Sequence, residues 1–280
     1  DLSDARLQNF IVRFDLATKV ALGSKLKAES HRLGYEMSED ALSWNVFVSL
    51  AEAGKLRSAA NFLIGQDIGE EPDLYLWGER VDVRGEASGC RYPPLVETIG
   101  NLESDILRFK TEPDIMLVLD GRIIICIEAK FGSGNPLAHH GKSKTHEKPI
   151  DRDCLIGRYL DRASERTKGA IDRDGIGRVF HSQLFRNLVF VSEMATCGDW
   201  HVVNLMSDTQ RKLGTTTDKC SFDDPRPHVR SYLRSGYRDR FHFKTWEELY
   251  CKVVKNTSGL AQLADYIRTK SAHYGRAFAL

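Results

Sequence analysis

The chain has 280 residues, and its 40 lysine and arginine residues nearly balance its 39 aspartate and glutamate residues, which leaves a formal net charge of +1. This balance excludes a uniformly basic, histone-like nucleic-acid binder. The hydrophobic fraction of 41% can form a buried core, and a charged fraction of 28% is typical of a folded domain. The length fits one large α/β domain or two small ones.

Charge is distributed unevenly along the chain. Residues 31–120 contain 8 basic and 17 acidic side chains, whereas residues 225–244 contain 6 basic and 1 acidic. This asymmetry is compatible with a surface that binds a polyanion. The alternative is an ordinary solvated surface.

The sequence also bears on the cellular compartment. It contains no run of 18 apolar residues, and its first 20 residues mix charges into the apolar positions. These features predict a cytoplasmic protein with no membrane association. The six cysteines are all more than twenty residues apart, which predicts free thiols rather than a zinc knuckle or a disulfide framework.

The first third of the chain predicts helices and then strands. Apolar residues at helical spacing predict a helix within residues 1–30. Ser38 is a typical N-cap, because two acidic residues and an apolar stripe follow it, and this second helix should end at Gly54. A third helix is expected over residues 56–64, followed by a strand over 74–77.

The centre of the chain predicts a hairpin. Strands are expected over residues 105–109, 115–119 and 123–127, and Asp120-Gly121 between the last two is a strong turn signal. The run Ile123–Ile127 is apolar at every position, so it should be a central strand covered on both faces.

The remaining elements complete an α/β pattern. A polar stretch predicts a loop over 132–152, and apolar runs predict further strands. The whole order indicates a single α/β domain with a helical C-terminal extension over 207–280. The further elements expected are a helix over 153–164, strands over 188–193 and 201–206, and helices over 227–235, 246–255 and 260–270.

Three charged residues of the predicted hairpin should lie together. Glu128 and Lys130 are two positions apart and share one face of their strand, and hairpin pairing brings Asp114 beside them. A buried strand that ends in a carboxylate and an ammonium group is costly unless these groups have partners. A divalent metal between the carboxylates resolves their repulsion, and Mg²⁺ prefers such ligands. The alternative is a surface ion pair, with Asp114 acting only as a turn residue.

The residues Pro113, Asp114, Glu128 and Lys130 resemble the motif of the PD-(D/E)-x-K nuclease superfamily. That resemblance implies a restriction-endonuclease-like fold, with a mixed central β-sheet flanked by helices and a nuclease-like core over residues 36–206. It implies that Asp114 and Glu128 bind Mg²⁺, with Mn²⁺ able to substitute, and that Lys130 is the catalytic lysine. The lysine would orient or activate the attacking water, or stabilise charge on the phosphate.

Members of this superfamily also carry an acidic residue upstream of the motif. Glu39 is the best match, at the start of its predicted helix, and Glu36 and Glu103 are the alternatives. Some relatives carry a polar residue and a tyrosine on the helix after the core strand, a part that Arg158 and Tyr159 could play.

Four arginines in the basic segment recur at a spacing of four residues. If the segment is one helix, Arg226, Arg230, Arg234 and Arg238 form a stripe suited to contacting nucleic-acid phosphates. The alternative is a solvated stripe that pairs with the acidic half of the chain.

The sequence therefore predicts a metal-dependent nuclease that hydrolyses phosphodiester bonds, with DNA as the expected substrate and a homodimer as one arrangement to consider. A catalytically inactive nucleic-acid-binding or interaction module on a nuclease-like fold is the alternative, and another carboxylate-dependent metal enzyme is the third hypothesis.

Overall fold

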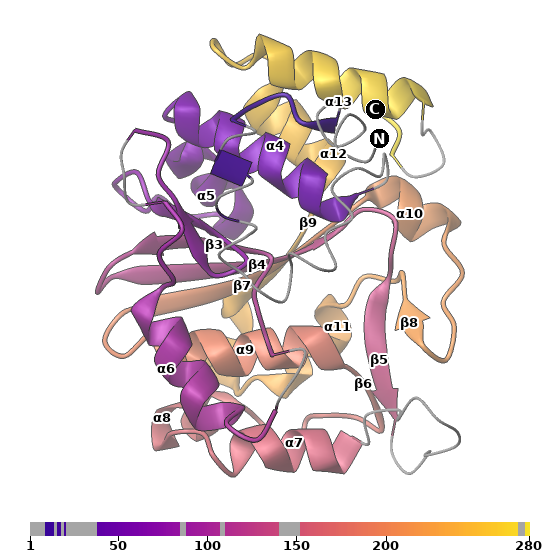
Figure 1. Cartoon of the computed structure of the whole chain (residues 1–280). Helices are drawn as coiled ribbons and strands as arrows, with labels where there is room; N and C mark the ends of the chain where they lie inside the picture. Colours follow the sequence, from indigo (N-terminus) through magenta and orange to yellow (C-terminus); the bar gives the residue numbers. More distant parts are fainter. Residues whose placement is uncertain are drawn as a thin grey trace.

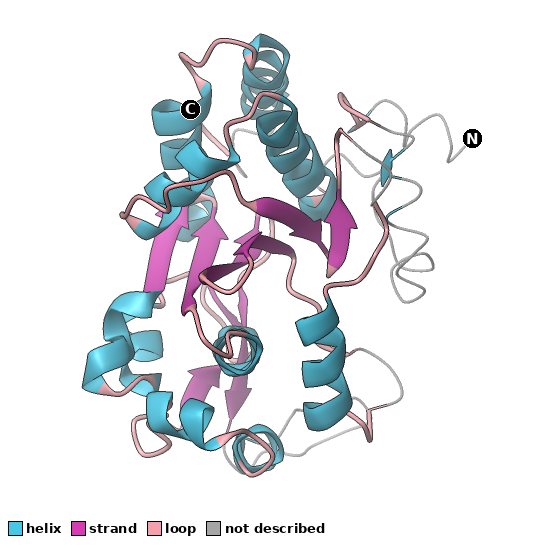
Figure 2. Ribbon diagram, turned by 90° about the vertical axis from the view of Figure 1, so that its left-hand side faces the viewer, coloured by secondary structure: helices cyan, strands magenta, loops and turns pink. Residues whose placement is uncertain are grey.

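The chain forms an α/β structure in which helices cover both faces of a mixed central sheet (Figures 1 and 2). The computed structural model describes residues 9–13, 16–17, 20, 38–84, 88–106, 110–139, 152–273 and 278–280. The α/β class with a flanked, mixed sheet is thus confirmed. The helix expected within residues 1–30 lies almost entirely outside the described residues.

The central sheet has six strands in the order β2-β1-β3-β4-β7-β9. The strands β2, β1, β3 and β4 pair with one another in antiparallel fashion, whereas the pairs β4–β7 and β7–β9 are parallel. The strands are β1 (Asp73–Leu76), β2 (Glu79–Val81), β3 (Ile115–Leu119), β4 (Ile123–Lys130), β7 (Asp199–Met206) and β9 (Phe241–Thr245).

The predicted β3–β4 hairpin is confirmed. Leu119 pairs with Ile123, so three residues connect the strands, and Gly121 supplies a positive φ of 67° within that connection. All eight residues of β4 are buried, as expected for a strand covered on both faces.

One face of the sheet is covered by α4 (Glu39–Glu52), α5 (Leu56–Ile64), α12 (Trp246–Leu249) and α13 (Ala261–His273). The expected N-cap is present, because the Ser38 side chain accepts a hydrogen bond from the Ala41 N–H at 3.1 Å. At the other boundary, α5 ends at Gly65, which adopts a left-handed φ of 76°.

The opposite face is covered by α9 (Ser182–Met194), and α6 (Pro93–Leu102), α7 (Arg152–Leu160) and α8 (Glu165–Ala170) pack against α9. The strand expected over 188–193 is wrong, because these residues belong to α9. Buried residues lie all around this helix, and a short apolar run of that kind does not distinguish a strand from a buried helix.

The expected loop over 132–152 is also partly wrong. Residues Asn135–His139 form β5, which pairs with β6 (Val179–His181) and β8 (Cys220–Ser221) in a second, three-stranded sheet. Residues 140–151 lie outside the described part of the chain. Of the strand expected over 105–109, residues 105–106 form no strand and 107–109 are not described.

The helical C-terminal extension expected over 207–280 contains helices, but it also supplies β9, which is an edge strand of the central sheet. Its sequence, FHFKT, alternates between the two faces and is only partly buried, so no long apolar run marks it. The helix α10 (Asp208–Leu213) follows β7 directly. No helix in the described residues has the length and apolar character needed to cross a bilayer.

Candidate active site

The structure brings Asp114, Glu128 and Lys130 together at one end of the β3–β4 hairpin. Ile115 pairs with Ile127, so Asp114 stands opposite Glu128. The Asp114 Oδ2 atom accepts a hydrogen bond from the Ala129 N–H at 3.0 Å, which fixes the aspartate against β4.

Glu128 and Lys130 form a buried ion pair. Lys130 Nζ donates to Glu128 Oε1 at 2.5 Å, and the two side chains are only 7% and 1% exposed respectively. Burial has the largest single effect on the pKa of Lys130 and acts to lower it. Attraction by Glu128, Asp114 and Glu39, together with the hydrogen bond to Glu128, outweighs burial and raises that pKa above its ordinary value. Three carboxylates therefore act on one ammonium group.

A second hydrogen-bond donor to Glu128 comes from the helix α9, which packs on the sheet. Asn187 of α9 is 1% exposed, and its Nδ2 donates to Glu128 Oε2 at 2.7 Å. Asn187 is not among the site residues predicted from the sequence, because the apolar run after it, residues 188–193, predicted a strand. The spacing of Leu184 and Leu188, one helical turn apart, could have indicated a helix, with Asn187 as a polar residue beside these apolar positions.

Two more buried asparagines support the strand behind Glu128. Asn204 of β7 donates from Nδ2 to the Glu128 backbone oxygen at 3.3 Å, and Asn135 of β5 donates to Asn204 Oδ1 at 3.0 Å. Buried amides of this kind need partners, and here they link three strands around the candidate site.

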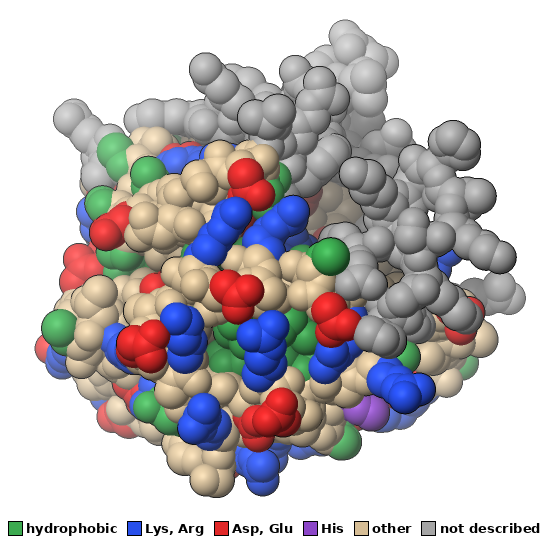
Figure 3. Space-filling model, turned by 90° about the horizontal axis from the view of Figure 1, so that it is seen from below, with side chains coloured by type: hydrophobic (Ala, Val, Ile, Leu, Met, Phe, Trp, Pro, Cys, Tyr) green, Lys and Arg blue, Asp and Glu red, His purple; other side chains and the backbone are tan. Residues whose placement is uncertain are grey.

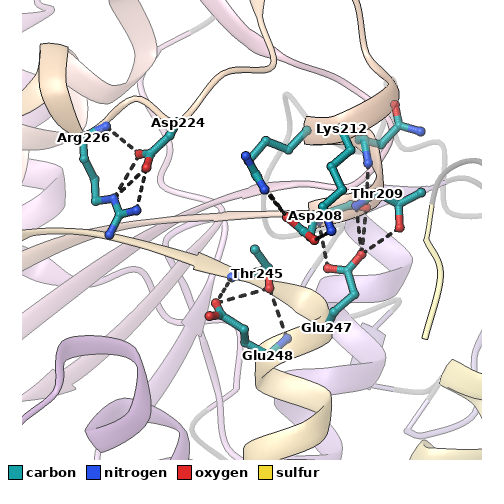
Figure 4. Close-up of polar contacts among 11 residues, drawn as sticks. Asp208, Thr209, Lys212, Asp224, Arg226, Thr245, Glu247 and Glu248 are labelled. Carbon is teal, nitrogen blue, oxygen red and sulfur yellow. Dashed lines mark hydrogen bonds and ion pairs between the residues drawn. The ribbon is translucent and has the colours of Figure 1, made fainter.

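The neighbouring strand ends fix Lys130 through its backbone. The carboxyl ends of the parallel strands β4, β7 and β9 meet at one edge, where the Lys130 oxygen accepts hydrogen bonds from Ser207 N and Trp246 Nε1, both at 3.1 Å. Glu247 of α12 joins this edge to α10, accepting from Asp208 N at 2.9 Å and from Thr209 N at 3.2 Å (Figure 4).

Glu39 lies in the first turn of α4 and contacts the segment after Lys130. Its Oε1 atom accepts hydrogen bonds from Phe131 N at 2.8 Å, Gly132 N at 3.2 Å and Ser133 N at 3.1 Å. The Ser133 hydroxyl also donates to Oε1, at 2.7 Å. The upstream acid therefore lies next to the motif, and one of its two oxygens is engaged in holding the backbone.

Of the two alternatives to Glu39, Glu103 lies in the described part of the chain, and its hydrogen-bond partners are not residues of the motif. Glu103 is fully buried and accepts hydrogen bonds from Thr111 N at 2.7 Å, the Thr111 hydroxyl at 2.5 Å and the Tyr159 hydroxyl at 2.6 Å. Its role in these contacts is structural. Glu36 lies outside the described residues.

The Arg158–Tyr159 pair is not at the candidate site. Tyr159 is bound to Glu103, and Arg158 approaches Asp105 at 4.0 Å. Both belong to α7, which lies below α9 in Figure 1, and it is α9 that contacts β4.

An ion-pair triad anchors the chain just before Asp114. Arg91 donates to Glu112 Oε1 at 2.6 Å and to Glu79 Oε1 at 2.8 Å, and both glutamate side chains are almost fully buried. Glu112 therefore pairs with Arg91, in the segment that precedes α6, and through Arg91 it is linked to Glu79 of β2, although it is only two residues from Asp114.

The expected arginine stripe is wrong, because its segment is not one helix. A four-residue helix, α11 (Arg226–Val229), is followed by two 3₁₀ turns, and the chain is extended at Leu233 and Arg234 between them. The arginines make separate contacts: Arg226 pairs with Asp224 at 2.6 Å (Figure 4), and Arg238 donates to the Leu233 oxygen.

The lower face of the molecule carries both signs of charge. In Figure 3 the described basic and acidic side chains lie beside one another over this face. Ion pairs between exposed side chains include Lys168–Glu165 within α8, at 2.9 Å, and Arg173–Asp161, at 3.2 Å. Isolated surface pairs of this type contribute little to stability.

The donor chemistry of the site suits a hard cation. Among the described residues, no group of three or more histidine, cysteine, aspartate or glutamate side chains has the geometry of a metal site. Mg²⁺ needs only one or two carboxylates, because waters and phosphate oxygens complete its shell, and two are present in Asp114, just before β3, and Glu128 of β4. In comparisons with known proteins, no family model, curated protein or solved structure matches the chain.

Proposed function

We propose that this protein is a metal-dependent nuclease that hydrolyses phosphodiester bonds, with DNA as its substrate. The observation that carries this proposal is the meeting of Asp114, which immediately precedes β3, with Glu128 and Lys130 of the adjoining strand β4, where Lys130 Nζ lies 2.5 Å from Glu128 Oε1. An aspartate, a glutamate and a lysine in this relation supply the groups that metal-assisted phosphodiester hydrolysis requires.

The order of elements supports a restriction-endonuclease-like core. The helix α4, the antiparallel strands β1, β3 and β4, the helix α9 and the parallel strand β7 occur in this order along the chain, with β2 as an additional strand at the edge of the sheet. This order agrees with the α-β-β-β-α-β arrangement that the resemblance to the superfamily implies. The second helix of that arrangement would be α9 and not the helix expected over residues 153–164.

Each residue has a defined role in the proposal. Asp114 and Glu128 would hold Mg²⁺, and a bound Mg²⁺ would lower the pKa of a coordinated water and neutralise charge on the phosphate. Lys130 would orient the attacking water or donate to a phosphate oxygen, where negative charge develops. Glu39 would act through its second oxygen, since Oε1 already accepts four hydrogen bonds.

Contact with the nucleic-acid backbone would come from separate cations rather than a helical stripe. Arg226, Arg234 and Arg238 are exposed, whereas Arg230 is partly buried and donates to the Phe241 oxygen. Individual phosphate contacts of this kind position a nucleic acid without reading its sequence.

The test is cleavage of supercoiled DNA, linear duplex DNA, single-stranded DNA and RNA, with Mg²⁺ or with a chelator. We expect Asp114→Asn, Glu128→Gln and Lys130→Met to lower Mg²⁺-dependent cleavage at least about 100-fold. Asp120→Asn is the matched control, because Asp120 is an exposed acid at the opposite end of β3.

Full Mg²⁺-dependent cleavage by Asp114→Asn or Lys130→Met would refute the assignment. Salt-dependent binding of nucleic acid without cleavage of any substrate would instead favour the inactive binding module.

A further inference from the structure

Trp77 adopts a backbone conformation that is unusual for its size. Its φ is +53°, in the left-handed region that bulky residues rarely occupy, and Gly78 follows with a φ of +81°. Leu76 pairs with Glu79, so Trp77 and Gly78 form the whole turn of the β1–β2 hairpin. Turns of this type normally contain asparagine, aspartate or glycine at the first position, and a tryptophan persists there only where its surroundings hold it.

Two contacts of the indole ring hold Trp77 in place. The side chain is fully buried and stacks on Trp44 of α4, with ring centroids 6.3 Å apart and an angle of 16° between the rings. Its Nε1–H donates to Asp40 Oδ1 at 3.0 Å. Both contacts are to α4, so the strained turn is attached to the helix that carries Glu39.

The backbone of Trp77 contacts Asp114, whereas its side chain contacts α4. The Trp77 N–H donates to the Asp114 backbone oxygen at 3.1 Å, beyond the last paired residues of β1 and β3. Asp114 in turn accepts from the Ala129 N–H, and Glu39, next to Asp40, accepts from the Phe131 N–H. Trp77 therefore closes a ring of contacts around the carboxylates.

We propose that Trp77 is a positioning residue that sets Asp114 relative to the first turn of α4, where Glu39 lies. This inference rests on the proposed metal site at Asp114 and Glu128. The indole holds Trp77 in the turn at positive φ, and the backbone N–H of the same residue donates to the Asp114 oxygen. The strain is retained because it preorganises the carboxylates.

The competing explanation is that Trp77 only fills the core. Trp44 provides the matched control, because it belongs to the same ring stack but its Nε1 donates to the Val12 oxygen at 2.9 Å, away from the carboxylates. Trp77→Phe and Trp44→Phe each remove one indole and one hydrogen bond, and each keeps an aromatic ring.

The first measurement is amide hydrogen exchange in the metal-free protein. We expect Trp77→Phe to speed exchange of the Ala129 and Phe131 amides about tenfold, because their acceptors Asp114 and Glu39 lose their fixed positions. Trp44→Phe should leave both amides within about twofold of the wild type. Equal acceleration in the two variants, or none in Trp77→Phe, would overturn the proposal even if the protein cleaves no nucleic acid.

The second measurement is the Mg²⁺ concentration at half-maximal cleavage. Trp77→Phe should raise it about tenfold while kcat at saturating Mg²⁺ changes less than about threefold, as expected for a residue that acts through a metal ligand. Asp40→Ala should reproduce the effect and Asp40→Asn, which keeps an acceptor for the indole, should rescue it. An unchanged Mg²⁺ requirement in both Trp77→Phe and Asp40→Ala would contradict the proposal.

Discussion

Removing the charge of Lys130 should leave Glu128 as an unpaired buried carboxylate. In the Lys130→Met variant the side chain keeps its approximate length, but Glu128, which is 1% exposed, has only Asn187 as a described side-chain donor. We expect the free energy of unfolding at neutral pH to fall by about 3–5 kcal/mol, the usual result of removing one partner of a buried ion pair.

The magnitude follows from the geometry of the pair. At the 2.5 Å separation of Lys130 Nζ and Glu128 Oε1, two unit charges attract by about 7 kcal/mol at an effective dielectric constant of about 20. Desolvation of the two charges offsets part of this attraction, which brings the expected loss into the range of about 3–5 kcal/mol. Lys130→Met combined with Glu128→Gln should recover most of the loss, because no buried charge then lacks a partner.

The assay is urea unfolding of the wild type, both single variants and the double variant in the presence of a chelator. The double-mutant cycle should give a coupling energy of about 2–4 kcal/mol between the two positions. A Lys130→Met loss below about 1 kcal/mol, or strictly additive effects, would refute the reasoning that a buried charge pair forms the centre of the site.

Three further predictions concern the surroundings. Asn187→Leu should lower the free energy of unfolding by about 1–3 kcal/mol, because Glu128 Oε2 loses a buried donor; a loss below about 0.5 kcal/mol in urea unfolding would count against that contact. Burial, and then the neighbouring His201, lower the pKa of His242 from 6.5 to about 3. The neutral His242 side chain therefore contributes fully to the free energy of unfolding above pH 6.5, and this contribution falls below pH 6.5 because the unfolded chain takes up a proton there. Unfolding at pH 5 should therefore cost about 2 kcal/mol less than at pH 7.5, and His242→Phe should reduce that difference. An undiminished difference in this variant would show that other groups cause it. Glu103→Gln should lower stability by about 1–3 kcal/mol but leave the Mg²⁺ requirement for cleavage unchanged, and a raised requirement would return Glu103 to the metal site.

The fold was predictable from sequence where local chemistry decides the structure. The Ser38 cap and the hairpin around Gly121 depend on residues close in sequence, and both are present. The run after Asn187 is apolar on every side, so only tertiary packing makes it the helix α9. Strand β9 is short and partly polar, and it becomes a strand only because β7 offers an edge for pairing.

In the candidate site, too, the contacts set by local sequence were predictable and those set by tertiary packing were not. Asp114, Glu128 and Lys130 meet because one hairpin sets their register, which the sequence spacing contains. The contact of Asn187 with Glu128 spans 59 positions, and nothing in the local sequence specifies it. Trp77 was expected to be the last residue of a strand, whereas β1 ends at Leu76 and Trp77 turns the chain.

The proposed function requires that Asp114 and Glu128 hold a divalent cation. The most direct test is a crystal structure of the protein with Mn²⁺, whose anomalous scattering identifies the ion. We expect an ion within about 2 Å of carboxylate oxygens from both residues. Absence of an ion there, at a Mn²⁺ concentration that supports cleavage, would contradict it, as would an ion bound only elsewhere.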